Sequence, residues 1–268
     1  MQPGRPHYTE LPPSPVLAPW IECWWTLHAA GPSPVPNRVL PDGCTDIILG
    51  LGDEPGPVAI GTMRSAAVYP LSAPVDYFGV RFRPGCGLPF LGVPLSELTD
   101  ARVRLDDLWG REAARLVDVP TDARLARMER VLSGRLHRWL RDRRNDEPLA
   151  SRAVALMRQS RGGASIRDVA SALGVGERRL ERAFDRSVGV APKVFARVLR
   201  LRRAVRRIEA ATGAGTPLVW TALAFDAGYA DQAHLIREFR ALAGVTPLEY
   251  ATEHEGVGFV QYDSAARA

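Results

Sequence analysis

The second half of the sequence repeats itself at an interval of about 55 residues. Ala170 and Gly174 in the first copy correspond to Ala224 and Gly228 in the second. Seven further positions match in the same order after a shift of one residue: Leu180, Arg182, Phe184, Gly189, Val190, Pro192 and Phe195 against Leu235, Arg237, Phe239, Gly244, Val245, Pro247 and Tyr250. This constrains the fold strongly, because a repeated sequence forms a repeated structural unit. We therefore expect two similar units in tandem.

Each copy has the pattern of two short helices joined by a tight turn. In the first copy, Ser165 and Asp168 have the spacing of a capping box, which starts a helix. Gly174 lies just past the end of this helix, where glycine can adopt the left-handed conformation that reverses the chain. A second helix is expected from Glu177 to Ser187, with its apolar side chains buried and its charged side chains outward. This pattern is typical of a helix-turn-helix motif.

The second copy has its own start signals. Thr216 is predicted as the N-cap of its first helix, with Pro217 at the first helical position, and Asp231 as the cap of its second helix. Between the copies, residues 192–210 are expected to form a connecting helix of about 28 Å with many basic side chains. Such a helix would separate the two second helices by nearly one turn of DNA, which is about 34 Å.

Positive charge is concentrated in this part of the chain. The whole sequence has 35 Lys and Arg against 30 Asp and Glu. Residues 148–253 contain 17 basic and 10 acidic residues, so they carry a net charge of +7 while the remainder is slightly acidic. A basic domain attracts polyanions such as nucleic acids, although a solvated arginine-rich surface is the simpler interpretation in the absence of a fold-level motif.

Two segments resemble the helix-turn-helix units of AraC-type regulators over about residues 148–252: VASALGVGERRLERAFDRSVGVAPKVFARVLRLRRA and ALAFDAGYADQAHLIREFRALAGVTPLEY. The resemblance implies a sequence-specific transcription regulator, without enzymatic activity, whose partner is double-stranded operator DNA. It also implies RNA polymerase as a partner if the protein is an activator. One departure is Gly176, where the family usually has Ser or Thr as N-cap, and glycine is tolerated there.

In that family, the early outward positions of each second helix contact bases. These positions, with two neighbouring arginines, are the candidate DNA-binding residues: Arg178, Arg179, Glu181, Arg182 and Arg186 in the first unit, and Gln232, Ala233, His234 and Arg237 in the second. Arg can pair with guanine, Gln with adenine and Glu with cytosine, so these side-chain types suit base recognition. Simpler interpretations are phosphate contacts for the arginines, an ion pair within its own helix for Glu181, and a capping role for His234.

The first hundred residues have the pattern of a small antiparallel β domain. Four β-prone runs separated by turn residues are expected to form strands: Ile21 to His28, Cys44 to Leu51, Val58 to Thr62 and Val75 to Arg83. The stretches PWIECWWTL, RVLPDGCTDIILGLGD and YFGVRFRPG resemble a sensor domain found before this DNA-binding module in many bacterial regulators. The resemblance implies a cupin-like β-barrel that holds an unknown small effector. The expected fold class is α+β multidomain, with an all-α C-terminal domain.

Aromatic and charged side chains of this domain form a candidate effector pocket: Trp24, Asp42, Asp46, Tyr77 and Arg81. Pockets for small molecules combine an apolar wall with a few polar groups. The simpler interpretation is that most of the aromatic side chains form the core of the barrel. Because successive side chains of a strand point to opposite sides, Arg81 and Arg83 share a face opposite Phe82, so the aromatic and charged side chains of this region cannot all line one lumen.

The region between the two domains is expected to be helical. Residues 122–144 place an apolar stripe along a charged helix: Leu125, Met128, Leu132, Leu136 and Trp139. The stripe must pack either on its own domain or on a second copy of the chain in a homodimer. The predicted organisation is a sensor domain at 1–105, a helical linker and candidate dimerisation region at 106–145, the DNA-binding domain at 146–253 and a tail at 254–268.

The three cysteines, Cys23, Cys44 and Cys86, lie far apart in the first third of the chain. Their number and spacing indicate neither a disulfide framework nor a zinc site, so reduced thiols are expected, and no cofactor or metal is predicted. The alternative function is a thiol- or metal-responsive regulator that uses these cysteines. A metalloenzyme is disfavoured because the first third offers only His7 and His28 as imidazole ligands.

The sequence has neither a long apolar run nor the pattern of a signal peptide. A cytoplasmic protein without membrane contact is therefore expected.

Overall fold

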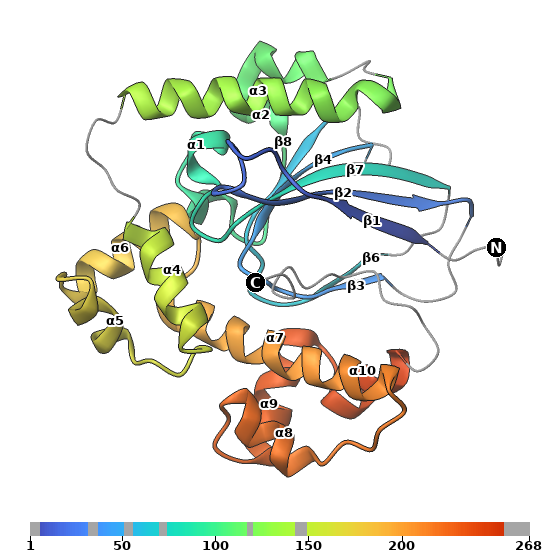
Figure 1. Ribbon diagram of the computed structural model, residues 1–268, viewed down its shortest axis with the longest axis vertical. Coiled ribbons are helices and arrows are strands. Elements are labelled where there is room, and N and C mark those ends of the chain that lie inside the picture. Colours follow the sequence, from blue (N-terminus) through green and yellow to red (C-terminus); the bar gives the residue numbers. More distant parts are fainter. Residues whose placement is uncertain are drawn as a thin grey trace.

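The computed structural model describes residues 6–31, 37–50, 56–69, 74–116, 120–142 and 149–254. An antiparallel sheet with covering helices forms the N-terminal part of the protein, and a set of helices forms the C-terminal part (Figure 1). The predicted boundary at residues 145 and 146 and nearly all of the predicted tail at 254–268 lie outside the described residues.

The main sheet has six strands in the order β1-β2-β7-β4-β5-β8. These strands are β1 (His7–Leu11), β2 (Ile21–Ala29), β4 (Thr45–Leu49), β5 (Val58–Ile60), β7 (Val75–Phe82) and β8 (Arg102–Arg104). Two further strands, β3 (Asn37–Val39) and β6 (Ala67–Tyr69), pair with each other in a separate ribbon. The four predicted strands correspond to β2, β4, β5 and β7, while the other four strands were not predicted.

The expectation of a closed β-barrel is wrong for the described part of the chain. There, β1 and β8 stand at the two ends of the sheet order and are not hydrogen-bonded to each other. β8 has only three residues, and β3 and β6 bind each other instead of extending the sheet. The sheet is therefore open, with helices on one face and the β3–β6 ribbon on the side of the other (Figure 1).

The described N-terminal part has four short helices and one long helix, α3: α1 (Leu88–Leu91), η1 (Leu95–Leu98), α2 (Leu105–Trp109), η2 (Gly110–Leu116) and α3 (Thr121–Asp142). α3 carries the predicted apolar stripe across one face of the sheet (Figure 1). Met128, Leu132 and Leu136 are buried there in one core with the sheet. Trp139 packs edge-on against Trp20, with ring centroids 5.6 Å apart. The stripe thus packs on its own domain and does not form an exposed seam for a second copy.

Seven helices form the described C-terminal part: α4 (Leu149–Gln159), α5 (Ile166–Ala172), α6 (Glu177–Ser187), α7 (Pro192–Gly213), α8 (Trp220–Ala227), α9 (Gln232–Ala243) and α10 (Pro247–His254). One core around Phe184 holds α4, α5 and α6 against the start of α7, and a second core around Phe239 holds α8, α9 and α10 against its later turns. α7 is about 33 Å long and runs through both units (Figure 1). The predicted tandem units and connecting helix are confirmed.

The helix starts follow the predicted caps with one exception. The Ser165 hydroxyl accepts a hydrogen bond from Asp168 N–H at 3.1 Å, and the Asp231 carboxylate accepts one from His234 N–H at 2.7 Å. The prediction that Thr216 caps the first helix of the second unit is wrong, because α8 begins only at Trp220. Thr216 instead donates its N–H to the Ala211 carbonyl at 2.9 Å, so it closes the end of α7.

Candidate DNA-binding surface and a buried polar cluster

α6 presents a charged surface because its apolar side chains pack into the core of the first unit. Leu180 and Phe184 are fully buried. The candidate DNA-binding residues of this helix are all exposed: Arg178, Arg179, Glu181, Arg182 and Arg186. Gly176 is the N-cap of α6 and provides no side-chain hydrogen bond, as its lack of a side chain requires. The structure therefore leaves this face of α6 available to a ligand.

α9 presents a less charged surface in the second unit. Gln232, Ala233 and Arg237 are exposed, while His234 is half-buried. The His234 ring packs edge-on against Tyr229 at 5.4 Å, and its Nδ1 accepts a hydrogen bond from Ala230 N–H at 3.3 Å. These contacts favour the capping role of His234 over its predicted base contact.

Two arginines of α7 bind helices of the second unit to the connecting helix. Arg197 donates to Glu238 of α9 at 2.7 Å, and Arg207 pairs with Asp226 of α8 at 3.1 Å. Burial lowers the pKa of Arg203 on the same helix, and the positive charges of Arg161, Arg207 and Arg206 lower it further. Positive charge gathered between two helix-turn-helix units favours a polyanion such as the DNA backbone.

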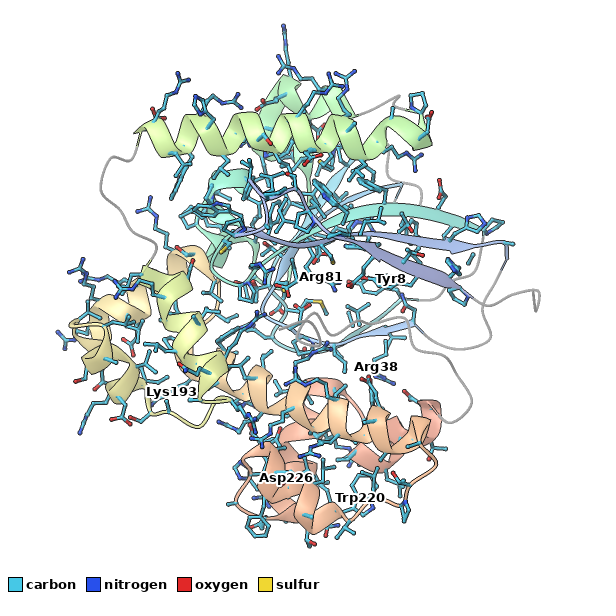
Figure 2. The ribbon with its side chains drawn as sticks, viewed as in Figure 1. Tyr8, Arg38, Arg81, Lys193, Trp220 and Asp226 are labelled. Carbon is cyan, nitrogen blue, oxygen red and sulfur yellow. The ribbon has the colours of Figure 1, made fainter. Side chains whose placement is uncertain are left out.

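A polar cluster lies on the sheet face that is turned away from α3. The Arg81 guanidinium is 3.4 Å from the Asp46 carboxylate, 3.6 Å from Asp42 and 3.9 Å from Glu10. Trp25 Nε1 also donates to Asp46 at 2.8 Å. Arg81 and Tyr8 both project from this face toward the β3–β6 ribbon (Figure 2). Three carboxylates thus surround one largely buried arginine among aromatic side chains.

Burial controls the titration of the groups in and near this cluster. It raises the pKa of Asp46 to about 6, although the neighbouring Arg81 guanidinium opposes this rise. Burial also raises the pKa of the thiols of Cys23, Cys44 and Cys86. Thiolates are the reactive form, so these surroundings favour inert thiols over the alternative of a thiol-responsive regulator.

The structure brings together four of the five predicted pocket residues. Asp42, Asp46 and Arg81 are joined by ion pairs, and Tyr77 lies against the apolar part of the same face. The inclusion of Trp24 was wrong, because it is buried on the opposite face and stacks on Phe78 with centroids 6.1 Å apart.

Sequence reasoning missed Tyr8 and Glu10 as members of this cluster. Both lie on β1, which was not predicted as a strand. The alternation of these two residues in a segment that pairs with β2 is the signal that places them on one face.

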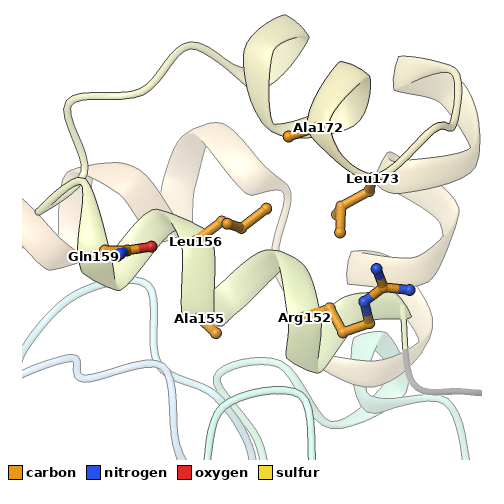
Figure 3. Close-up of a pocket in the computed structure, with 6 residues that line it drawn as sticks. All are labelled: Arg152, Ala155, Leu156, Gln159, Ala172 and Leu173. Carbon is orange, nitrogen blue, oxygen red and sulfur yellow. The ribbon is translucent and has the colours of Figure 1, made fainter.

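A separate pocket of about 520 Å³ lies in the first helix-turn-helix unit, between α4 and α5 (Figure 3). Its lining residues are Arg152, Ala155, Leu156, Gln159, Ala172 and Leu173. It shares none of these residues with the polar cluster of the N-terminal part, so it is not the predicted effector pocket.

Within the described residues, no group of three or more His, Cys, Asp or Glu side chains is arranged to hold a metal ion. In the same part of the chain, no helix is both long and apolar enough to cross a membrane.

Two families match different parts of the chain. Residues 9–104 match a domain of unknown function (DUF6597), and residues 169–253 match the family described as a helix-turn-helix domain. No curated protein shows significant similarity to the chain. The second match begins within α5 and extends into α10, so it includes α6, α7 and α9, in agreement with the duplication in the sequence.

Solved structures with low similarity to the chain include the following three. A transcriptional regulator from Chromobacterium violaceum, described as having an AraC-type DNA-binding domain, is 24% identical over 45% of this chain and 96% of its own, with a TM-score of 0.35. ToxT from Vibrio cholerae, solved with a bound unsaturated fatty acid, is 13% identical over 97% of this chain and 100% of its own, with a TM-score of 0.43. ToxT from strain O395 is 11% identical over 96% of each chain, with a TM-score of 0.41.

Proposed function

We propose that the chain is a DNA-binding transcription regulator of the AraC type, and that it reads two neighbouring segments of an operator with α6 and α9 of its helix-turn-helix domain. The observation that carries the proposal is the pair of helix-turn-helix units joined by α7. At about 33 Å, α7 is close to the length of one turn of DNA, which is about 34 Å. Each recognition helix would then enter the major groove on the same side of the duplex.

The exposed side chains of the two helices suit different tasks. Arg178, Glu181 and Arg182 on α6 provide donors for guanine and an acceptor for cytosine, and Gln232 on α9 can bracket adenine. We assign Arg179, Arg186 and Arg237 to the same surface, where each faces a base edge or a nearby phosphate. Ala233 would pack against a thymine methyl group. His234 completes the predicted set, although its contacts within the turn support a structural role.

We test this proposal with selection from a randomised operator library, followed by binding measurements at increasing salt. The basic C-terminal part should release counterions from DNA, so affinity should fall by about 10³-fold or more between 50 and 200 mM salt. The selected sequences should contain two conserved segments about one helical turn apart. Affinity that does not respond to salt, or a library without sequence enrichment, would contradict the proposal.

We also propose that a small effector controls DNA binding through the N-terminal part. The polar cluster supports this role, because Arg81 and its carboxylates supply polar groups beside an apolar wall that includes Trp25 and Tyr77. The measurement is footprinting of the adjacent promoter with and without candidate metabolites. An effector that acts through the cluster should lose its influence in Arg81→Met.

Homodimer formation and contact with RNA polymerase follow from the family and stay predictions. Dimerisation would raise affinity for a repeated operator because the second binding event becomes intramolecular. The α3 stripe is buried in its own domain and cannot supply the seam, so another surface must do so. Sedimentation of the full-length protein at micromolar concentration measures this directly.

A further inference from the structure

Four residues between β3 and β4 connect the polar cluster to both helix-turn-helix units. This 40–43 segment has the sequence Leu-Pro-Asp-Gly. β3 leads into the segment, and Arg38 on β3 lies above α7 beside α10 (Figure 2). Arg38 donates to the Ala243 carbonyl at 3.1 Å and pairs with Glu253 at 3.0 Å. The start of the segment is therefore held on the second unit.

Leu40 completes the hydrophobic core of the second unit. Its side chain is 1% exposed and shares that core with Leu201, Leu223 and Phe239. All three of these partners come from helices of the C-terminal part. A side chain of the N-terminal part is thus a structural component of the second helix-turn-helix unit.

Gly43 contacts the core of the first unit. It has φ +82°, and a Cβ at this position would overlap the ring of Phe195. Phe195 is fully buried and packs against Phe184 with ring centroids 5.9 Å apart. The backbone at Gly43 therefore lies directly on the aromatic pair that holds α6 and α7 together.

Asp42 ties the same segment to the sheet. Its carboxylate accepts a hydrogen bond from Cys44 N–H at 2.8 Å and lies 3.6 Å from Arg81 Nε. Within four residues, the chain thus contacts the core of the second unit, the polar cluster and the core of the first unit.

A neighbouring loop, residues 61–66, also contacts both units. The Thr62 hydroxyl donates to the Val188 carbonyl at 2.6 Å, and Ala66 N–H donates to the Leu242 carbonyl at 2.7 Å. Both carbonyls lie beside the glycine turn that follows the recognition helix in each copy. The N-terminal part therefore forms hydrogen bonds with the two helix-turn-helix units at nearly equivalent positions.

From these contacts we infer that Asp42 is a positioning residue for DNA binding. The ion pair between Asp42 and Arg81 fixes the 40–43 segment, and this segment holds the two units at one separation. The presence or loss of this ion pair in the polar cluster therefore selects the operator spacing that the protein reads. Close-packed cores move between discrete arrangements and do not deform continuously, so a change at Asp42 is passed to both units. The inference rests on the proposed reading of two operator segments.

The test uses operators in which the two recognised segments are separated by the best spacing or by one or two base pairs more or fewer. The full-length wild-type protein should bind one spacing best. Asp42→Asn keeps an acceptor for Cys44 N–H but removes the charge, and it should lower the affinity ratio between the best and the neighbouring spacings by about tenfold. Asp42→Glu retains the charge and should restore most of this ratio.

Asp106→Asn is the matched control. Asp106 also pairs with an arginine, Arg104, at 2.5 Å, but this pair is exposed and makes none of the contacts of the 40–43 segment. It should leave the spacing profile unchanged. If circular dichroism shows that Asp42→Asn does not fold, Asp42→Ser takes its place, because it also removes the charge and keeps a short oxygen acceptor at this position.

The outcomes separate this inference from the proposed function. A spacing profile that keeps its wild-type shape in Asp42→Asn, or in Asp42→Ser where that variant is used, overturns the inference. An equal loss at every spacing also overturns it, because such a loss indicates general destabilisation. If wild-type protein prefers no spacing at all, the proposed reading of two segments is itself wrong.

Discussion

Arg182 and Gln232 are exposed side chains of different chemistry on the two recognition helices. An arginine that clamps guanine contributes about 1 to 3 kcal/mol, whereas a lost phosphate contact weakens binding to all sequences alike. Arg182→Ala should therefore reduce affinity more steeply than Gln232→Ala, and the effect of Gln232→Ala should be mainly on sequence preference. Binding of both variants to a randomised operator library measures the difference. Equal losses that are independent of sequence would refute these roles.

Asp46 makes the stability of the N-terminal part depend on pH. Burial raises its pKa to about 6, above the value of about 3.9 for an unfolded chain. The ionised carboxylate therefore destabilises the fold at neutral pH, and this penalty shrinks as the pH falls through 6. Between pH 7.5 and 5, the wild type should gain about 1 kcal/mol of unfolding free energy relative to Asp46→Asn. Urea unfolding at both pH values tests this, and a constant difference would contradict it.

Trp24 and Trp25 show why the pocket could be predicted only in part. The expected alternation along a strand is interrupted by a bulge between Ile21 and Cys23. Ile21 and Trp24 face the core under α3, while Cys23 and Trp25 face the polar cluster. A bulge depends on pairing with a distant strand, so the sequence of β2 alone does not reveal which tryptophan points where.

The two recognition helices differ in how they begin. The Asp231 carboxylate caps α9, whereas Gly176 leaves the start of α6 without a side-chain bond. Asp231→Ala should cost about 1 kcal/mol of stability, and Asp231→Ser should retain most of it. Thermal unfolding of the three proteins measures the effect. An alanine variant as stable as the serine variant would show that the cap does not hold α9.

Elements with local signals could be predicted from the sequence, and elements without them could not. Both helix-turn-helix units follow from caps and glycine turns that lie within a few residues of the structure they cause. β3, β6 and β8 are short strands outside the predicted β-prone runs, and they exist because of partners elsewhere in the chain. The closed barrel was wrong for the same reason, since closure depends on which strands meet.

At the scale of the whole molecule, the hydrophobic core of the second helix-turn-helix unit contains residues of both the N-terminal and the C-terminal part. Leu40→Ala should lower the unfolding free energy by about 2 to 5 kcal/mol, because it leaves a cavity in the second helix-turn-helix unit. Val68→Ala truncates an exposed side chain of the neighbouring β3–β6 ribbon, and it should change the unfolding free energy by about 0.5 kcal/mol or less. Urea unfolding compares the two, with hydrogen exchange locating the loss in α8 and α9. Similar small effects would mean that Leu40 is dispensable.

The shared core limits how regulators of this design can recombine. A gene fusion that joins a foreign sensor to this DNA-binding part near residue 146 would keep every helix of both units but omit Leu40. The transplanted second unit would carry a hole the size of a leucine side chain, and the discarded sensor would expose that leucine to water. A functional chimera must therefore carry Leu40 and its 40–43 segment along with the helices. The second helix-turn-helix unit is thus completed by a residue that lies before the predicted domain boundary at residue 146.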